Sequence, residues 1–172
     1  MIDRRRTLRL ALAAMPAAAL LGSRAARAEQ AFERFYPFLI DLPGWTGNKP
    51  DGMAMQMASM SIMTATREYR RADARAHAGI MTGPAAQGGL AMIQSGMKVE
   101  TADAHMSTDT VDGLKIARTY TTKDQSGAIL VGLADTALFS FSFNKLAEDE
   151  AFTLARRFDW KAIQVALAAL PK

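Results

Sequence analysis

The sequence predicts a single α+β domain in which a twisted antiparallel sheet of about six strands packs with helices at its start, middle and end. Apolar and polar residues alternate over several segments between residues 53 and 143, which is the period of a half-buried strand. Turn-forming residues separate those segments. After residue 144 the apolar residues recur at helical spacing instead.

The first 28 residues predict an export signal that is removed from the mature chain. Their apolar run at residues 10–22 is too short to span a bilayer. The run is followed by an A-x-A cleavage site, so we expect cleavage between Ala28 and Glu29. A basic motif precedes the run: Arg4, Arg5 and Arg6. The mature chain of 144 residues (172 minus 28) has the size of one domain.

The basic motif is similar to a twin-arginine signal, in which an apolar residue and a lysine follow the arginine pair. Leu8 and Arg9 stand at those places, whereas Thr7 replaces the usual aromatic residue. We therefore expect the twin-arginine export machinery to deliver the chain to the periplasm. The general secretory route is one alternative, and an N-terminal helix that stays on the protein is another.

The net charge argues against a nucleic-acid partner once the signal is removed. The signal holds six of the 21 Lys and Arg residues and one of the 17 Asp and Glu residues, which leaves 15 basic against 16 acidic residues. Nucleic-acid binding depends on a positive surface that neutralises phosphates. The chain has no cysteine, so we expect neither disulfides nor a lipid anchor, and no stable membrane anchor after cleavage.

The longest predicted strand spans residues 53–69. Met53, Met55 and Met57 alternate with other residues, and the phase shifts after residues 58–59, so we expect a bulge or bend there. A returning strand is expected at residues 74–82, after a polar turn.

Turns and helices are predicted along the rest of the chain. The Gly-rich segment 83–89 is expected to be a loop before a short helix at 90–98. Asp112-Gly113 is suited to a tight hairpin. Asn144 and Asp159 are expected to cap the two closing helices. The remaining strands are expected at residues 105–111, 114–122, 128–134 and 137–144.

No strong catalytic motif is present in the sequence. His77 and His105 lie on predicted strands without a second ligand at close spacing, so a catalytic or metal role is the least favoured reading. Four carboxylates are candidate acids or bases that the sequence does not pair with a histidine: Asp51, Glu68, Asp109 and Asp112.

The methionine-rich segment MAMQMASMSIM is a candidate Cu(I) site, because thioether sulfur is a soft ligand that favours Cu(I). The candidate ligands are Met53, Met55, Met57, Met60 and Met63, with Met106 and His105 as further donors from elsewhere. Methionine also fills irregular cores, which is the alternative reading. Two further alternatives remain. Exposed methionines react with oxidants to form sulfoxides, which can be reduced again. A methionine-rich strand at a sheet edge can also bind a partner protein.

Several short motifs resemble those of uncharacterised exported bacterial proteins. These motifs are LPGW at residues 42–45, the Gly- and Met-rich strand, Ala65-x-Arg67-x-Tyr69, the VDG hairpin at residues 111–113 and a closing helix pair. The order of elements also resembles the Mog1/PsbP-like architecture, which implies an accessory or binding protein. The resemblance implies no functional residue.

The sequence therefore favours a soluble periplasmic protein without catalytic activity or cofactor, which binds or assists an unknown envelope component or small ligand. A methionine-based Cu(I) binder or chaperone is the first alternative. An enzyme with a pocket that joins a histidine to a carboxylate is the second.

Replacing Arg4 and Arg5 together with lysine should block export, because the twin-arginine route reads the arginine pair and not only its charge. Cell fractionation should then show the precursor in the cytoplasm, whereas the mature wild-type chain should begin at Glu29 by mass spectrometry. The same exchange at Arg24 and Arg27 is the matched control. Export of the Arg4/Arg5 variant at the wild-type level would exclude this route.

Overall fold

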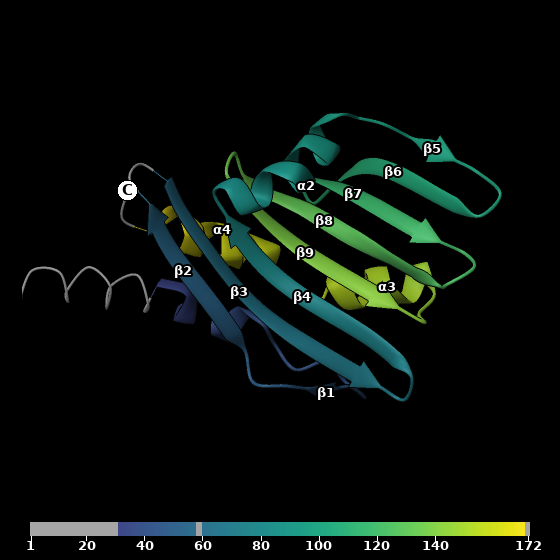
Figure 1. Ribbon diagram of the computed structural model, residues 1–172, viewed down its shortest axis with the longest axis horizontal. Helices are drawn as coiled ribbons and strands as arrows, with labels where there is room; N and C mark the ends of the chain where they lie inside the picture. The colour runs from purple at the N-terminus through teal and green to yellow at the C-terminus, as the bar shows by residue number, and fades with distance from the viewer. Residues whose placement is uncertain (1–30, 58–59, 171–172) are drawn as a thin grey trace, which may run out of the picture.

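A nine-stranded antiparallel sheet runs through the protein (Figure 1), seen in a computed structural model that describes residues 31–57 and 60–170. The strands are β1 (Thr46–Gly47), β2 (Asp51–Met57), β3 (Met60–Arg71), β4 (Ala74–Thr82), β5 (Val99–Glu100), β6 (Ala104–Val111), β7 (Leu114–Thr121), β8 (Ser126–Ala134) and β9 (Ala137–Asn144). The helices are the 3-10 helix η1 (Tyr36–Phe38) and the α-helices α2 (Pro84–Gln94), α3 (Glu148–Ala155) and α4 (Trp160–Ala168). The predicted α+β class and single domain are confirmed.

The strands follow the order β1-β3-β4-β9-β8-β7-β6-β5, and β2 pairs with β3 beside β1. The prediction of about six strands is wrong in number. The two-residue strands β1 and β5 are too short to leave an alternation pattern in the sequence. The third additional strand is β2, which was expected to be continuous with β3.

The segment expected as one bent strand is an antiparallel hairpin. Met57 lies opposite Met60, and the pairing continues to Asp51 opposite Thr66. Residues 58–59, where a bulge was predicted, lie outside the described residues. The phase shift in the alternation therefore marks a reversal of the chain, which places the methionines of both strands side by side.

The inner face of the sheet carries the main hydrophobic core, and η1, α3 and α4 lie against it behind the sheet in Figure 1. Three phenylalanines of β9, Phe139, Phe141 and Phe143, point to this face, as their alternation predicted. They are at most 5% exposed. The closing helices bury Ala151, Leu154, Ala155, Trp160 and Ile163, and Phe158 between them is buried as well.

Helix α2 lies on the opposite face, which is the outer face of the sheet (Figure 1). It packs Leu90 and Ile93 against Leu138 in a small second core. The helix starts at Pro84, inside the segment predicted as a loop, because proline is tolerated in the first turn of a helix. A Cβ at Gly89 would lie 2.5 Å from a Leu138 methyl group, so this glycine permits close contact with the sheet.

Local turn and cap chemistry agrees with the sequence except at one residue. Asp112 and Gly113 have φ of 53° and 82°, the conformation of the predicted tight hairpin. The Asp159 side chain accepts a hydrogen bond of 2.9 Å from the Ala162 amide, as expected of a cap. Asn144 is instead the last residue of β9, and α3 begins after Ala147 without a side-chain cap.

Arg67 joins the LPGW loop to the sheet. Its side chain is only 13% exposed, and it donates to the carbonyl oxygens of Leu39 (2.7 Å) and Asn48 (2.8 Å) and to the Asp41 carboxylate. Two strand positions later, Tyr69 donates to the Ile40 carbonyl oxygen at 2.8 Å. Burial is the main reason that the pKa of Tyr69 is raised to about 12.

Trp45 of the LPGW motif packs against β3 as well, because the Arg71 guanidinium lies 4.5 Å from its ring centroid. Trp45 of the LPGW motif thus contacts the same strand that carries Arg67 and Tyr69 of the A-x-R-x-Y motif. Their role in the described structure is to hold residues 39–48 against the end of β3.

Replacing Arg67 with alanine should lower the free energy of unfolding by about 1.5–3 kcal/mol, because its charge-assisted hydrogen bonds are lost and the part-buried Leu39 carbonyl group loses its donor. Arg70→Ala is the matched control on the same strand, where the side chain is 64% exposed, and it should change stability by at most about 0.5 kcal/mol. Urea unfolding measures both. Equal losses in the two variants would contradict this role of Arg67.

Candidate functional site

The outer face of the sheet is only partly covered, and its uncovered part is the candidate functional site. Helix α2 contacts β3, β4, β7, β8 and β9, and it packs over the end of β4 and the start of β9. The hairpin of β2 and β3 and the opposite ends of β4 and β9 lie beyond it (Figure 1). Two areas result on this face, a methionine stripe on the hairpin and, beyond Thr66 along β3, a polar groove on β3, β4 and β9.

The methionine stripe consists of Met53, Met55, Met57 and Met60, which are 41–50% exposed. The first three alternate along β2 on one face, and Met57 pairs with Met60. Met63 does not belong to it, since it is 4% exposed in the main core on the inner face. Four of the five candidate Cu(I) ligands thus share one surface.

The other proposed donors lie far from the stripe. Met106 and His105 are on β6, six strand spacings from β2, or about 29 Å at about 4.8 Å per strand. His105 also points to the opposite face, where its ring packs against Tyr120. Neither residue can complete a site at the hairpin.

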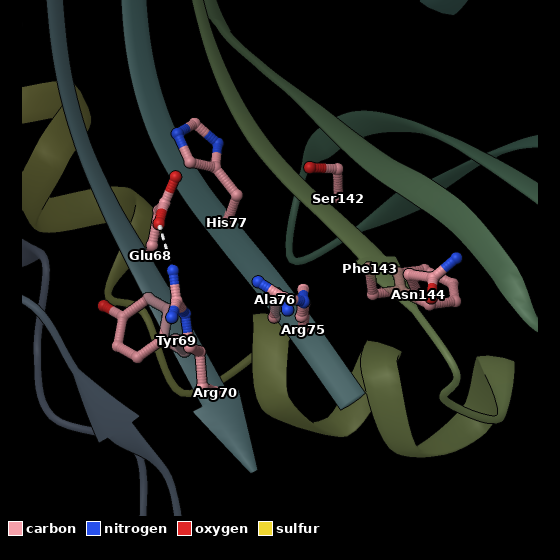
Figure 2. Close-up of a pocket in the computed structure, with 9 residues that line it drawn as sticks. All are labelled: Glu68, Tyr69, Arg70, Arg75, Ala76, His77, Ser142, Phe143 and Asn144. Carbon is pink, nitrogen blue, oxygen red and sulfur yellow. Dashed lines mark ion pairs between the residues drawn. The ribbon is translucent and has the colours of Figure 1, made fainter. Parts of the chain in front are cut away.

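The polar groove is a hollow of about 290 Å³ at the ends of β3, β4 and β9. In one row across the sheet, Glu68 is opposite His77 and His77 is opposite Ser142. In the next row, Arg70 is opposite Arg75 and Arg75 is opposite Asn144. Figure 2 shows these six side chains on one side of the strands.

Strand alternation creates the groove. The residues between the polar ones are Tyr69, Ala76 and Phe143, which are at most 5% exposed and point to the inner core. The core therefore fixes the backbone of all three strands, and the polar side chains are presented from a rigid floor. Gly79 and Ser140, opposite each other in the next row, extend this floor toward α2.

His77 lies between Glu68 and Ser142, as in an acid–base site, but it forms no ion pair with the Glu68 carboxylate in the described residues. A general base must reach its partner within about 3.2 Å. In the described part of the chain, the Glu68 carboxylate pairs with Arg70 at 3.7 Å, and no ion pair joins it to His77. The geometry is that of a row of polar side chains and does not form a hydrogen-bonded catalytic relay.

His105 has a structural environment on the inner face. Its Nε2 atom lies 2.7 Å from the carboxylate of Glu148, the first residue of α3. Arg118 lies 3.9 Å from the same carboxylate and over the Phe152 ring. These contacts attach α3 to β6 and β7, so the pair of histidine and carboxylate here connects elements of the fold.

The other candidate acids do not meet a histidine. Asp112 forms an ion pair with Arg156 at 2.9 Å, Asp51 starts β2, and Asp109 lies on β6 opposite Ile116. Within residues 31–57 and 60–170, no group of three or more His, Cys, Asp or Glu side chains could hold a metal ion.

Four groove residues were not among the candidates from sequence: Arg70, Arg75, Ser142 and Asn144. The turn between β3 and β4 carries the signal that pairs Arg70 with Arg75, because a short hairpin fixes the register of its strands. The pairing of β4 with β9 joins residues far apart in the chain, and no local pattern indicates it.

Comparisons with protein-family models, curated proteins and solved structures return no match to this chain. In the described residues, no helix is long and apolar enough to cross a membrane.

Proposed function

We propose that this chain is a periplasmic, non-catalytic binding or accessory protein that acts through the uncovered part of its outer face. The observation that carries the proposal is the methionine stripe beside the polar groove on one surface. Contiguous exposed apolar groups with polar residues around them are typical of interaction sites. Methionine suits such a surface because its unbranched side chain adapts to different partners.

The edge position of the hairpin supports the same function. Strand β2 pairs with β3 on one side only, so its other edge has no strand partner among the described residues. Backbone groups at such an edge are able to bind an extended segment of another protein. The resemblance to Mog1/PsbP-like accessory proteins agrees with this role.

A photo-crosslinking residue at Met55 should form discrete products in the periplasm, because this position lies on the proposed contact surface. The matched control is the same residue at Val165, which is 69% exposed on α4. Electrophoresis of the periplasmic fraction measures both. Products from Val165 and none from Met55 would contradict the assignment of the surface.

Cu(I) binding by the methionine stripe is the second candidate function. The observation that favours it is the gathering of four thioethers on one face, with Met57 and Met60 directly opposite each other. Thioethers bind Cu(I) without losing a proton. Three rotatable bonds in each side chain allow sulfurs from neighbouring positions to approach one ion.

The mature protein should bind Cu(I) under reducing conditions if this second function is right, and replacing Met53, Met55 and Met57 with isoleucine should abolish uptake because the sulfur ligands are lost. Competition with a chromogenic chelator measures the uptake, and circular dichroism checks the fold. Met97→Ile is the control, since Met97 is also 50% exposed but lies outside the stripe. No uptake by the wild-type protein ends this candidate.

A further inference from the structure

The polar groove contains an excess of positive charge that no contact within the described structure requires. Arg70 and Arg75 are direct cross-strand partners on the outer face. Like charges directly opposite each other destabilise an antiparallel pair. The arrangement is therefore unfavourable for the sheet alone, and an anion between the two guanidinium groups would remove the repulsion.

The nearby acidic groups do not neutralise both arginines. Glu68 lies 3.7 Å from Arg70, and both side chains are more than half exposed, so this pair is weak. Arg75 has no carboxylate within ion-pair distance in residues 31–57 and 60–170. Asp73, at the adjacent turn, forms its ion pair with Lys145 at 3.1 Å, and both side chains are more than half exposed. Arg75 therefore keeps free donors at the groove.

The groups around Arg75 are those that recognise a phosphate. Guanidinium groups donate in a fork that matches the oxygens of phosphate, and two forks enter the groove from neighbouring strands. The amide of Asn144 and the hydroxyl of Ser142 are further donors beside them. His77 adds a ring nitrogen that also donates.

We infer that the polar groove binds a phosphate group, with Arg75 as its main anchor and Arg70, Asn144 and Ser142 as further donors. The volume of about 290 Å³ fits a phosphate with a small substituent, at the lower end of the size of ligand pockets. This inference rests on the proposed function and names the ligand class for one part of the uncovered face. The phosphate belongs either to a soluble monoester or to a phospholipid headgroup, which share this chemistry.

Isothermal titration of the mature protein with inorganic phosphate and with glycerol 3-phosphate tests the soluble source. Saturable binding with millimolar or tighter affinity is expected. Arg75→Ala should weaken it roughly tenfold or more, because a charge-assisted donor is lost. Glu68→Gln should strengthen binding, since it removes a negative charge next to the ligand. Arg157→Ala, which removes an exposed arginine elsewhere, should change nothing.

Sedimentation with phosphatidylcholine vesicles, with and without phosphatidylglycerol, tests the lipid source. Binding to the anionic vesicles alone, lost in Arg75→Ala and kept in Arg157→Ala, would assign the phosphate to a headgroup. Equal binding by wild type and Arg75→Ala, or no binding of any probe, overturns the inference. Crosslinking at Met55 is independent of this groove, so its success would leave the proposed function in place after such a result.

Discussion

The structure is governed by the difference between the width of its sheet and the size of the helix that covers one face. Helix α2 contacts five strands, but it is only about 17 Å long and about 10–12 Å wide, whereas nine strands at about 4.8 Å each span a much wider sheet. The inner face is buried by η1, α3, α4 and the loop that Arg67 holds. On the outer face α2 spans 11 residues, so part of a nine-stranded sheet must face water or a partner.

This uncovered area explains the composition of the strands that cross it. Most side chains that point inward from β3, β4 and β9 are apolar, with Arg67 as an exception, whereas those that face the polar groove are polar or charged. On the β2–β3 hairpin, by contrast, four of the outward side chains are exposed methionines. The hairpin is therefore a place where apolar area stays exposed on the outer face.

The sequence correctly predicted the elements that are determined by a few neighbouring residues. The φ > 0 turn at Asp112-Gly113, the alternating phenylalanines of β9 and the Asp159 cap each follow from a few neighbouring residues, and all three are confirmed. The hairpin at residues 53–69 was misread because a bulge and a reversal produce the same phase shift. The start of α2 at Pro84 was missed because its Gly-rich first turns are typical of a loop, and packing on Leu138 stabilises them as a helix.

The candidate site was less accessible to prediction, because it depends on pairing between distant strands. The methionines and His77 were candidate site residues from the sequence, and four of those methionines lie on one surface in the structure. The sequence did not indicate that β4 lies between β3 and β9, which sets His77 between Glu68 and Ser142. The sequence also could not show that Met63 lies apart from the other methionines. An alternating pattern shows that residues share a face, but only the structure shows which face is buried.

The contact between the LPGW loop and β3 also limits which residues can stand together at positions 47 and 67. A Cβ at Gly47 would lie 2.7 Å from the Arg67 guanidinium, so a side chain at residue 47 and an arginine at residue 67 exclude each other in this conformation. A relative that replaces Arg67 loses the reason to keep glycine there, and one that gains a side chain at residue 47 must hold the loop differently. These two positions should therefore covary, and their joint presence would identify chains that fold this loop in the same way.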